Sequence, residues 1–181
     1  MKKFIVLIII MFGFFKSASA NYTQLAYNFE FQGIDGKVIK LSDFENKVMV
    51  VVNVASRCGF TNQYKDLQKL WIDYQDKGLV VIGVPTNDFK QEPGSNNDIK
   101  NFCETNFNID FLLSEKINVI GDDSHPFFKW AKDNYGKDAI PKWNFHKIII
   151  GKNGKVADTF ASITKPSSKR FINFIEKTIK N

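Results

Sequence analysis

Only two cysteines and two histidines occur in this chain of 181 residues, and neither residue type forms a closely spaced pair. Structural zinc sites usually combine such pairs, so the composition argues against a zinc site. The sequence also lacks repeats and low-complexity tracts, and its scattered lysines form no basic stripe with interleaved aromatic residues. A repeat architecture and a nucleic-acid-binding surface are therefore not indicated.

The first 20 residues have the pattern of a secretory signal peptide. Two lysines precede an apolar segment at Phe4–Phe15, which is too short to span a bilayer comfortably, and Ser17–Ala20 offer a small-residue cleavage site. No cysteine follows the apolar segment, so a lipid-anchored form is not indicated. We expect cleavage after Ala20 and an exported protein, periplasmic or secreted, without stable membrane association. An uncleaved anchor is the alternative, because Lys16 interrupts the pattern.

Removing residues 1–20 takes away three lysines and no acidic residue, so the net charge falls from +6 to +3. The remaining residues 21–181 are enough for one domain with a full hydrophobic core and give no reason for a second. Export to an oxidising compartment makes a disulfide between Cys58 and Cys103 feasible. Such a bridge is either a static structural link or one state of a redox cycle, and both readings stay open at this stage.

The hydrophobic pattern alternates between strands and helices. Residues 29–41 alternate apolar and polar around Asp35-Gly36, which predicts a β-hairpin. Apolar runs at 47–55 and 79–84 predict two buried parallel strands, joined by a helix over about 62–77. Further predicted elements are a helical turn at 42–44, helices over about 96–105, 126–136 and 168–179, and a hairpin with strands at 146–150 and 156–161.

This order predicts an α/β three-layer sandwich with a mixed central sheet, and such sheets place chemistry at the carboxyl ends of parallel strands. Cys58 lies there, in the turn between the first buried strand and the following helix. Unpaired backbone N–H groups and the positive end of the helix favour an anion at this position, and Arg57 adds a cation next to it. We therefore expect the Cys58 thiolate to form more readily than that of an ordinary cysteine. The alternative is a buried structural cysteine.

The chain closely resembles the glutathione peroxidases in four motifs that occur in order and at compatible spacing. The motifs are Asn53–Thr61 (NVASRCGFT), Gln91–Ser95 (QEPGS), Trp143–Phe145 (WNF) and Thr164–Pro166 (TKP). The resemblance covers nearly all of residues 21–181. It implies a thioredoxin-like fold and an enzyme that reduces hydrogen peroxide or organic hydroperoxides with a thiol reductant and no bound cofactor.

The resemblance identifies Cys58 as the peroxidatic residue, with Thr61 in the place of the second cysteine of a Cys-x-x-Cys pair. The Cys58 thiolate would attack one peroxide oxygen and become a sulfenic acid while water or an alcohol leaves. Trp143 and Asn144 match two hydrogen-bond donors that the family places around the sulfur, and both stabilise negative charge without carrying charge. Taken alone, these two residues would be read as a buried aromatic residue and a turn asparagine.

One position departs from the family pattern. Many members have Asn-Gln-Phe-Gly before the Gln-Glu-Pro-Gly motif, whereas this chain has Asn-Asp-Phe-Lys at 87–90 and one residue fewer. Asp88 thus stands at the family's catalytic glutamine, yet a carboxylate donates no hydrogen bond and repels a nearby thiolate. Either Asp88 is held neutral, or it faces away while Asn87, Gln91 or a backbone N–H supplies the donor. We favour the second interpretation.

Cys103 matches the resolving cysteine of the family's two-cysteine members, which are generally served by thioredoxin rather than glutathione. It lies 45 positions after Cys58, on the predicted helix at 96–105. In this role Cys103 would attack the sulfenic acid and form an intramolecular disulfide, which a thioredoxin-like donor would reduce. The bridge is expected to require local loosening of that helix. The alternative is a helical cysteine that only fills the core.

Two other functions stay open. One is a peroxide sensor or redox-signalling module in which a Cys58–Cys103 disulfide changes the surface offered to a partner protein. The other is a non-catalytic thioredoxin-like domain with a static bridge. The resemblance implies a monomer or a weak dimer, because the loop before Trp143 lacks the insertion that tetrameric animal enzymes use for assembly. His125 and His146 are expected to be surface or turn residues without a catalytic role.

Overall fold

The computed structural model describes residues 22–181, so the predicted signal peptide at 1–20 lies outside the described residues. The central sheet has five strands in the order β5-β4-β3-β6-β7. β3 pairs in parallel with β4, which pairs in parallel with β5, while β6 and β7 continue the sheet in antiparallel pairing. The sheet is therefore mixed, as predicted. The strands are β3 (Val48–Val54), β4 (Leu79–Pro85), β5 (Leu112–Leu113), β6 (Lys147–Ile150) and β7 (Val156–Phe160).

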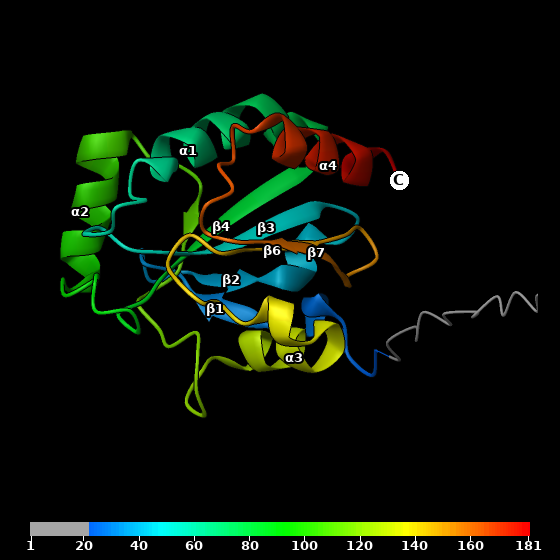
Figure 1. Ribbon diagram of the computed structural model, residues 1–181, viewed down its shortest axis with the longest axis horizontal. Coiled ribbons are helices and arrows are strands. Elements are labelled where there is room, and N and C mark those ends of the chain that lie inside the picture. The colour runs from blue at the N-terminus through cyan, green and yellow to red at the C-terminus, as the bar shows by residue number, and fades with distance from the viewer. Residues whose placement is uncertain (1–21) are drawn as a thin grey trace, which may run out of the picture.

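Helices cover both faces of this sheet, so the predicted three-layer sandwich is confirmed (Figure 1). α1 and α4 lie on one face, α3 lies on the other beside the N-terminal hairpin, and α2 stands at one end of the sheet. The four helices are α1 (Gln63–Tyr74), α2 (Asn96–Phe107), α3 (Pro126–Tyr135) and α4 (Lys169–Lys180). Within residues 22–181, none of the helices has both the length and the apolar character that crossing a bilayer requires.

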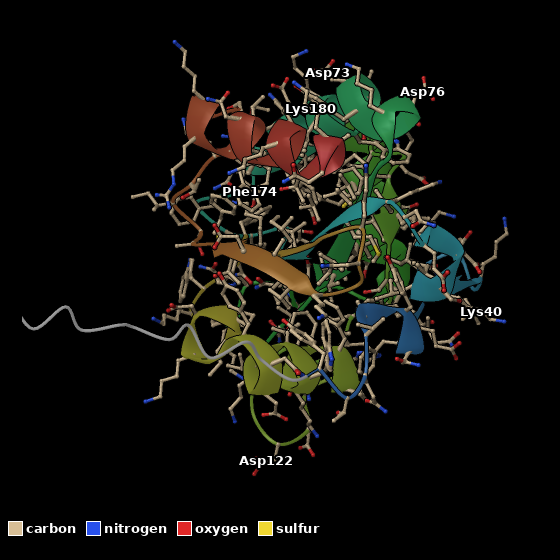
Figure 2. The ribbon with its side chains drawn as sticks, turned by 90° about the vertical axis from the view of Figure 1, so that its right-hand side faces the viewer. Lys40, Asp73, Asp76, Asp122, Phe174 and Lys180 are labelled. Carbon is tan, nitrogen blue, oxygen red and sulfur yellow. The ribbon has the colours of Figure 1, made fainter. Side chains whose placement is uncertain are left out.

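The side chains of β3 alternate between two hydrophobic clusters, because successive residues of a strand point to opposite faces. Val50 and Val52 belong to the cluster that contains the inner side chains of α1 and α4. Met49 and Val51 belong to the cluster that contains those of α3 and the hairpin. Figure 2 shows Phe174 of α4 between its helix and the sheet, where its ring meets that of Phe160 with centroids 5.3 Å apart.

The N-terminal hairpin consists of β1 (Glu30–Gln32) and β2 (Val38–Lys40), which form a separate two-stranded antiparallel sheet. Its turn contains Gly36 at φ +83°, a conformation that glycine adopts without steric cost. The hairpin predicted from the alternating pattern is thus present. Short 3-10 turns occur at Ala26–Asn28, Leu41–Phe44, Gln75–Lys77 and Lys137–Ala139.

α2 begins at a reciprocal pair of capping hydrogen bonds. The Asp98 N–H donates to the Ser95 hydroxyl oxygen at 3.2 Å, and the Ser95 N–H donates to the Asp98 carboxylate at 2.8 Å. These bonds satisfy amide donors that a helix start leaves unpaired, which typically stabilises the helix by about 1 kcal/mol. α2 runs two residues beyond the predicted end, because Asn108 stops it in a left-handed conformation at φ +49°.

His146 is a correction to the sequence prediction, because it is buried rather than at the surface, with 7% of its area exposed. It directly precedes β6, and no described residue hydrogen-bonds to its Nε2. Burial is the largest cause that lowers its pKa from 6.5 to about 4, with a further contribution from the charge of Lys147. His125 lies at the start of α3, where its Nδ1 accepts the Phe127 N–H at 3.3 Å. This places His125 at a turn, as expected.

Candidate active site

Cys58 lies in the turn between β3 and α1, at the carboxyl end of β3. Its side chain is 8% exposed, and its Sγ accepts a hydrogen bond from the Phe60 N–H at 3.4 Å. The Cys58 N–H donates to Thr61 Oγ1 at 3.0 Å, and the Thr61 hydroxyl donates to the Ala55 carbonyl at 2.9 Å. Thr61 therefore closes the turn from the position of the second cysteine in a Cys-x-x-Cys pair. A backbone N–H directed at the sulfur stabilises negative charge there.

The Gln-Glu-Pro-Gly motif is fixed against this turn by Glu92. Both the N–H and the hydroxyl of Ser56 donate to Glu92 Oε2, at 2.7 and 2.9 Å. The Glu92 side chain is 1% exposed, and this burial raises the pKa of its carboxyl, which the two Ser56 hydrogen bonds oppose. The Arg57 N–H adds a bond to the Gln91 carbonyl at 3.1 Å. These three hydrogen bonds hold Gln91 and Glu92 next to the turn that contains Cys58.

The segment 143–146 is held by Asn53, the one amide side chain in the apolar run of β3. Asn53 Nδ2 donates to the Trp143 carbonyl at 3.2 Å, and its Oδ1 accepts the His146 N–H at 3.1 Å. Between them, the Phe145 N–H donates to the Asn53 carbonyl at 2.6 Å. Phe145 has a left-handed backbone at φ +64°, which is unfavourable for a bulky residue, and its buried ring compensates for this.

Trp143 and Asn144 differ in exposure. The Trp143 ring is 40% exposed and lies beside Phe89, with ring centroids 5.5 Å apart. Asn144 is completely buried, and its Nδ2 donates to Gln91 Oε1 at 3.0 Å. Because Gln91 also bonds to Arg57, two hydrogen bonds connect Asn144 to the Cys58 turn. Trp143, which precedes Asn144 in the chain, instead lies at the surface.

Asp88 is engaged with a different part of the chain. Its Oδ2 accepts hydrogen bonds from the N–H groups of Val119 at 2.7 Å and Ile120 at 3.1 Å. The Asp88 N–H donates to Thr86 Oγ1 at 3.3 Å. The carboxylate thus fastens the loop at 117–120, a task that requires only acceptors. The interpretation favoured from the sequence, that Asp88 faces away from Cys58 and has no direct catalytic role, stays a prediction.

Cys103 lies inside α2 and is completely buried, and it is a free thiol, as is Cys58. Burial raises the pKa of the Cys103 thiol to about 11, an effect that the neighbouring Tyr64 hydroxyl partly opposes. The two cysteines belong to the same hydrophobic cluster. At neutral pH, Cys103 in this conformation is a protonated thiol that faces the core. Among residues 22–181, no group of three or more His, Cys, Asp or Glu side chains is placed to hold a metal ion.

Comparison with known proteins decides the family. The sequence profile described as "Glutathione peroxidase" matches residues 26–132. A hydroperoxy fatty acid reductase from Synechocystis sp. is 44% identical over 159 residues, which cover 83% of this chain and 93% of that protein. The chain belongs to the glutathione peroxidase family. It is accordingly an oxidoreductase of the peroxidase type, and both predictions are confirmed.

Further relatives of the chain support the same family assignment and the fold. A glutathione peroxidase-like peroxiredoxin from Saccharomyces cerevisiae is 44% identical over 151 residues, or 81% of this chain and 93% of that protein. The crystal structure of Trgpx in apo form superposes with a TM-score of 0.69 at 34% identity, covering 88% of this chain and 97% of that one. A thioredoxin family protein from Chlorobium tepidum has a TM-score of 0.63 at 14% identity, covering 83% and 92%, and so shares the fold.

The sequence prediction missed the residues that hold this candidate site together. Asn53 was visible as a single amide within an apolar strand, a position where a polar side chain needs a partner. Glu92 was visible as a charged residue inside the Gln91–Ser95 motif. No feature of the sequence indicated Lys116. Its ammonium group donates hydrogen bonds to the carbonyls of Glu92 and Gly94 and so stabilises the Gln91–Ser95 motif.

Proposed function

We propose that the chain is a thiol peroxidase in which Cys58 is the peroxidatic residue. The observation that carries the proposal is the Phe60 N–H directed at the Cys58 sulfur in the turn before α1. The thiolate attacks one peroxide oxygen, the O–O bond breaks, and the second oxygen takes up a proton and leaves as water or an alcohol. Cys58 is then a sulfenic acid. Trp143 and Asn144 donate hydrogen bonds to the charge that develops on oxygen.

Cys103 completes the proposed cycle as the resolving residue. Its thiolate attacks the Cys58 sulfenic acid, the S–O bond breaks, and the departing hydroxide takes up a proton and leaves as water while the disulfide forms. Because Cys103 is buried inside α2 with a pKa of about 11, this step requires a local opening of the helix that exposes the thiol. A thioredoxin-like dithiol then reduces the bridge. The relatives named glutathione peroxidase-like peroxiredoxins support this assignment.

The substrate class that we propose includes organic hydroperoxides as well as hydrogen peroxide. One relative is named a hydroperoxy fatty acid reductase. The exposed Trp143 ring and its neighbour Phe89 offer an apolar surface, and each is adjacent in the chain to an exposed lysine, Lys142 or Lys90. Such a surface suits an apolar chain that ends in a carboxylate.

We further propose that the protein acts as an exported monomer, periplasmic or secreted. The support for export is the signal-peptide pattern of residues 1–20. An exported enzyme cannot draw on cytosolic thioredoxin, so its donor is an exported thioredoxin-like protein. Fractionation of cells, with mass spectrometry of the N-terminus, tests this: the expected species begins at Asn21, and an intact N-terminus in the cytosol would contradict export.

The catalytic proposal is tested by peroxide consumption with a thioredoxin system and, separately, with glutathione. Wild type is compared with Cys58→Ser and Cys103→Ser. We expect turnover with the thioredoxin system that needs both cysteines. Turnover with glutathione that survives loss of Cys103 would keep Cys58 as the peroxidatic residue and remove the resolving step. Turnover that survives loss of Cys58 would overturn the proposal.

A peroxide sensor is the second candidate, and the placement of Cys103 favours keeping it. A disulfide from Cys58 to a buried position in α2 would remodel this helix and the surface around it. Catalytic turnover that is slow beside the oxidation of one specific partner protein would favour the sensor. Rapid turnover without such a partner would favour the peroxidase.

A further inference from the structure

We infer that Gln91 is a positioning residue: its Oε1 accepts one N–H hydrogen of the Asn144 amide and leaves the second one free for the proposed role of Asn144 at Cys58. The inference rests on the proposed role of Cys58. It gives Gln91 a task distinct from that of the family's catalytic glutamine, whose position is occupied by Asp88. Gln91 acts as an acceptor toward Asn144 rather than as a donor toward the sulfur.

The backbone around Gln91 is fixed on both sides. Its carbonyl accepts the Arg57 N–H at 3.1 Å, one residue before Cys58. The next residue, Glu92, receives two hydrogen bonds from Ser56 and donates its own N–H to Asn87 Oδ1 at 3.0 Å. These bonds fix the backbone next to Gln91, and the bond to Asn144 fixes the end of its side chain. Gln91 is therefore suited to define the direction of a neighbouring group.

The Asn144 amide depends on this single contact. Its Nδ2 donates to Gln91 Oε1 at 3.0 Å, and its Oδ1 is buried without a partner among residues 22–181. An unpaired buried carbonyl oxygen typically costs about 1–3 kcal/mol, and such groups often lie at functional sites. Nδ2 carries two hydrogens, and Gln91 uses one. Among residues 22–181, the Asn144 side chain forms no other hydrogen bond that would fix the orientation of its amide.

Asp88 is not available for the same task. Both hydrogen bonds that its carboxylate accepts come from backbone N–H groups of the loop at 117–120. A carboxylate turned toward a thiolate would also repel it. The chain thus keeps a neutral amide next to Asn144 and uses the acidic side chain for the loop.

The test is a double-mutant cycle between Gln91→Leu and Asn144→Ala, made in a Cys103→Ser background so that only the first step is followed. The rate constant for Cys58 oxidation by hydrogen peroxide is measured in single turnover. The pH is chosen high enough that the rate constant no longer increases with pH. Gln68→Leu is the matched control, because Gln68 makes two side-chain hydrogen bonds to Asp110 away from the site. Thermal unfolding of each variant reports its stability.

We expect Asn144→Ala to lower the rate by roughly 100-fold and Gln91→Leu by about tenfold. The double variant should match Asn144→Ala within about threefold, because Gln91 acts through Asn144. Gln68→Leu should lower the unfolding temperature and leave the rate unchanged. Effects of Gln91→Leu and Asn144→Ala that multiply, or no effect of Gln91→Leu, would overturn the positioning role while Cys58 keeps its own. A Cys58 that does not react with peroxide in the parent protein would overturn the proposed function and this inference together.

Discussion

The two cysteines of this chain belong to one hydrophobic cluster, yet their surroundings are opposite. Cys58 follows a strand in a tight turn, where a backbone N–H points at its sulfur. Cys103 lies in the middle of α2, where the helix uses its own N–H groups, and burial raises its pKa to about 11. Both side chains are nearly or fully buried, so burial alone does not decide which thiol reacts. The difference lies in the backbone donors that each position offers.

Alkylation of the native protein tests the difference between the two thiols most directly. At pH 7 only about one Cys103 thiol in 10⁴ is ionised at a pKa near 11, and the helix also hides it. We therefore expect iodoacetamide to modify Cys58 at least 1,000 times faster than Cys103, as measured by peptide mass spectrometry over time. In concentrated urea the two rates should become similar. Equal rates in the native protein would show that the turn gives Cys58 no advantage.

Acid should lower the free energy of unfolding through His146, which lies in the segment 143–146. Its pKa is about 4 in the folded protein and about 6.5 when unfolded, so between these values only the unfolded state binds the proton. Stability therefore falls as pH falls through this window, and at pH 5 the loss from this group is about 2 kcal/mol relative to pH 7. Urea unfolding of wild type and His146→Leu at both pH values measures it. Between pH 7 and pH 5, the free energy of unfolding of the variant should fall by about 2 kcal/mol less than that of wild type. An equal fall in both proteins would show that His146 is not the cause.

The environment of Cys103 can be changed at the start of its helix. Ser95→Ala removes the hydroxyl that caps α2 and should destabilise the helix by about 1 kcal/mol. If local opening exposes Cys103, its alkylation rate rises about fivefold. Ser168→Ala is a matched control, because the Ser168 hydroxyl caps α4 by accepting the Phe171 N–H at 3.4 Å. A similar rise in both variants would indicate global rather than local opening.

The smallest expected effect is that of Tyr64→Phe. The Tyr64 hydroxyl is buried beside the Cys103 thiol, and it partly offsets the rise in the pKa of this thiol. Its removal should raise the pKa of Cys103 further, by less than about one unit. The pH dependence of Cys103 alkylation in a Cys58→Ser background measures the change. A lower pKa in the variant would contradict the assigned direction.

Local pattern was enough to predict the four helices, the two hairpins, the two long parallel strands and the Cys58 turn, because these depend on neighbours in sequence, whereas the two-residue strand β5 was not predicted. α2 begins at its predicted first residue, Asn96, and the helical segment predicted to end at Lys77 does so, with a 3-10 turn as its last part. Contacts across the fold were not predictable in this way. Asp88 meets Val119 and Ile120 more than 30 positions away, and Gln91 meets Asn144 across 53 positions. His146 was wrongly placed at the surface, because its burial depends on tertiary packing.

The capping pair at the start of α2 has a consequence for the fate of an oxidised enzyme. In the proposed cycle the lifetime of the Cys58 sulfenic acid is set by how often α2 opens, and Ser95 and Asp98 hold this helix closed. A sulfenic acid that waits too long meets a second peroxide and becomes a sulfinic acid, which ordinary thiols cannot reverse. Two side chains that take no part in the reaction itself would thereby balance repair against permanent inactivation when peroxide is abundant.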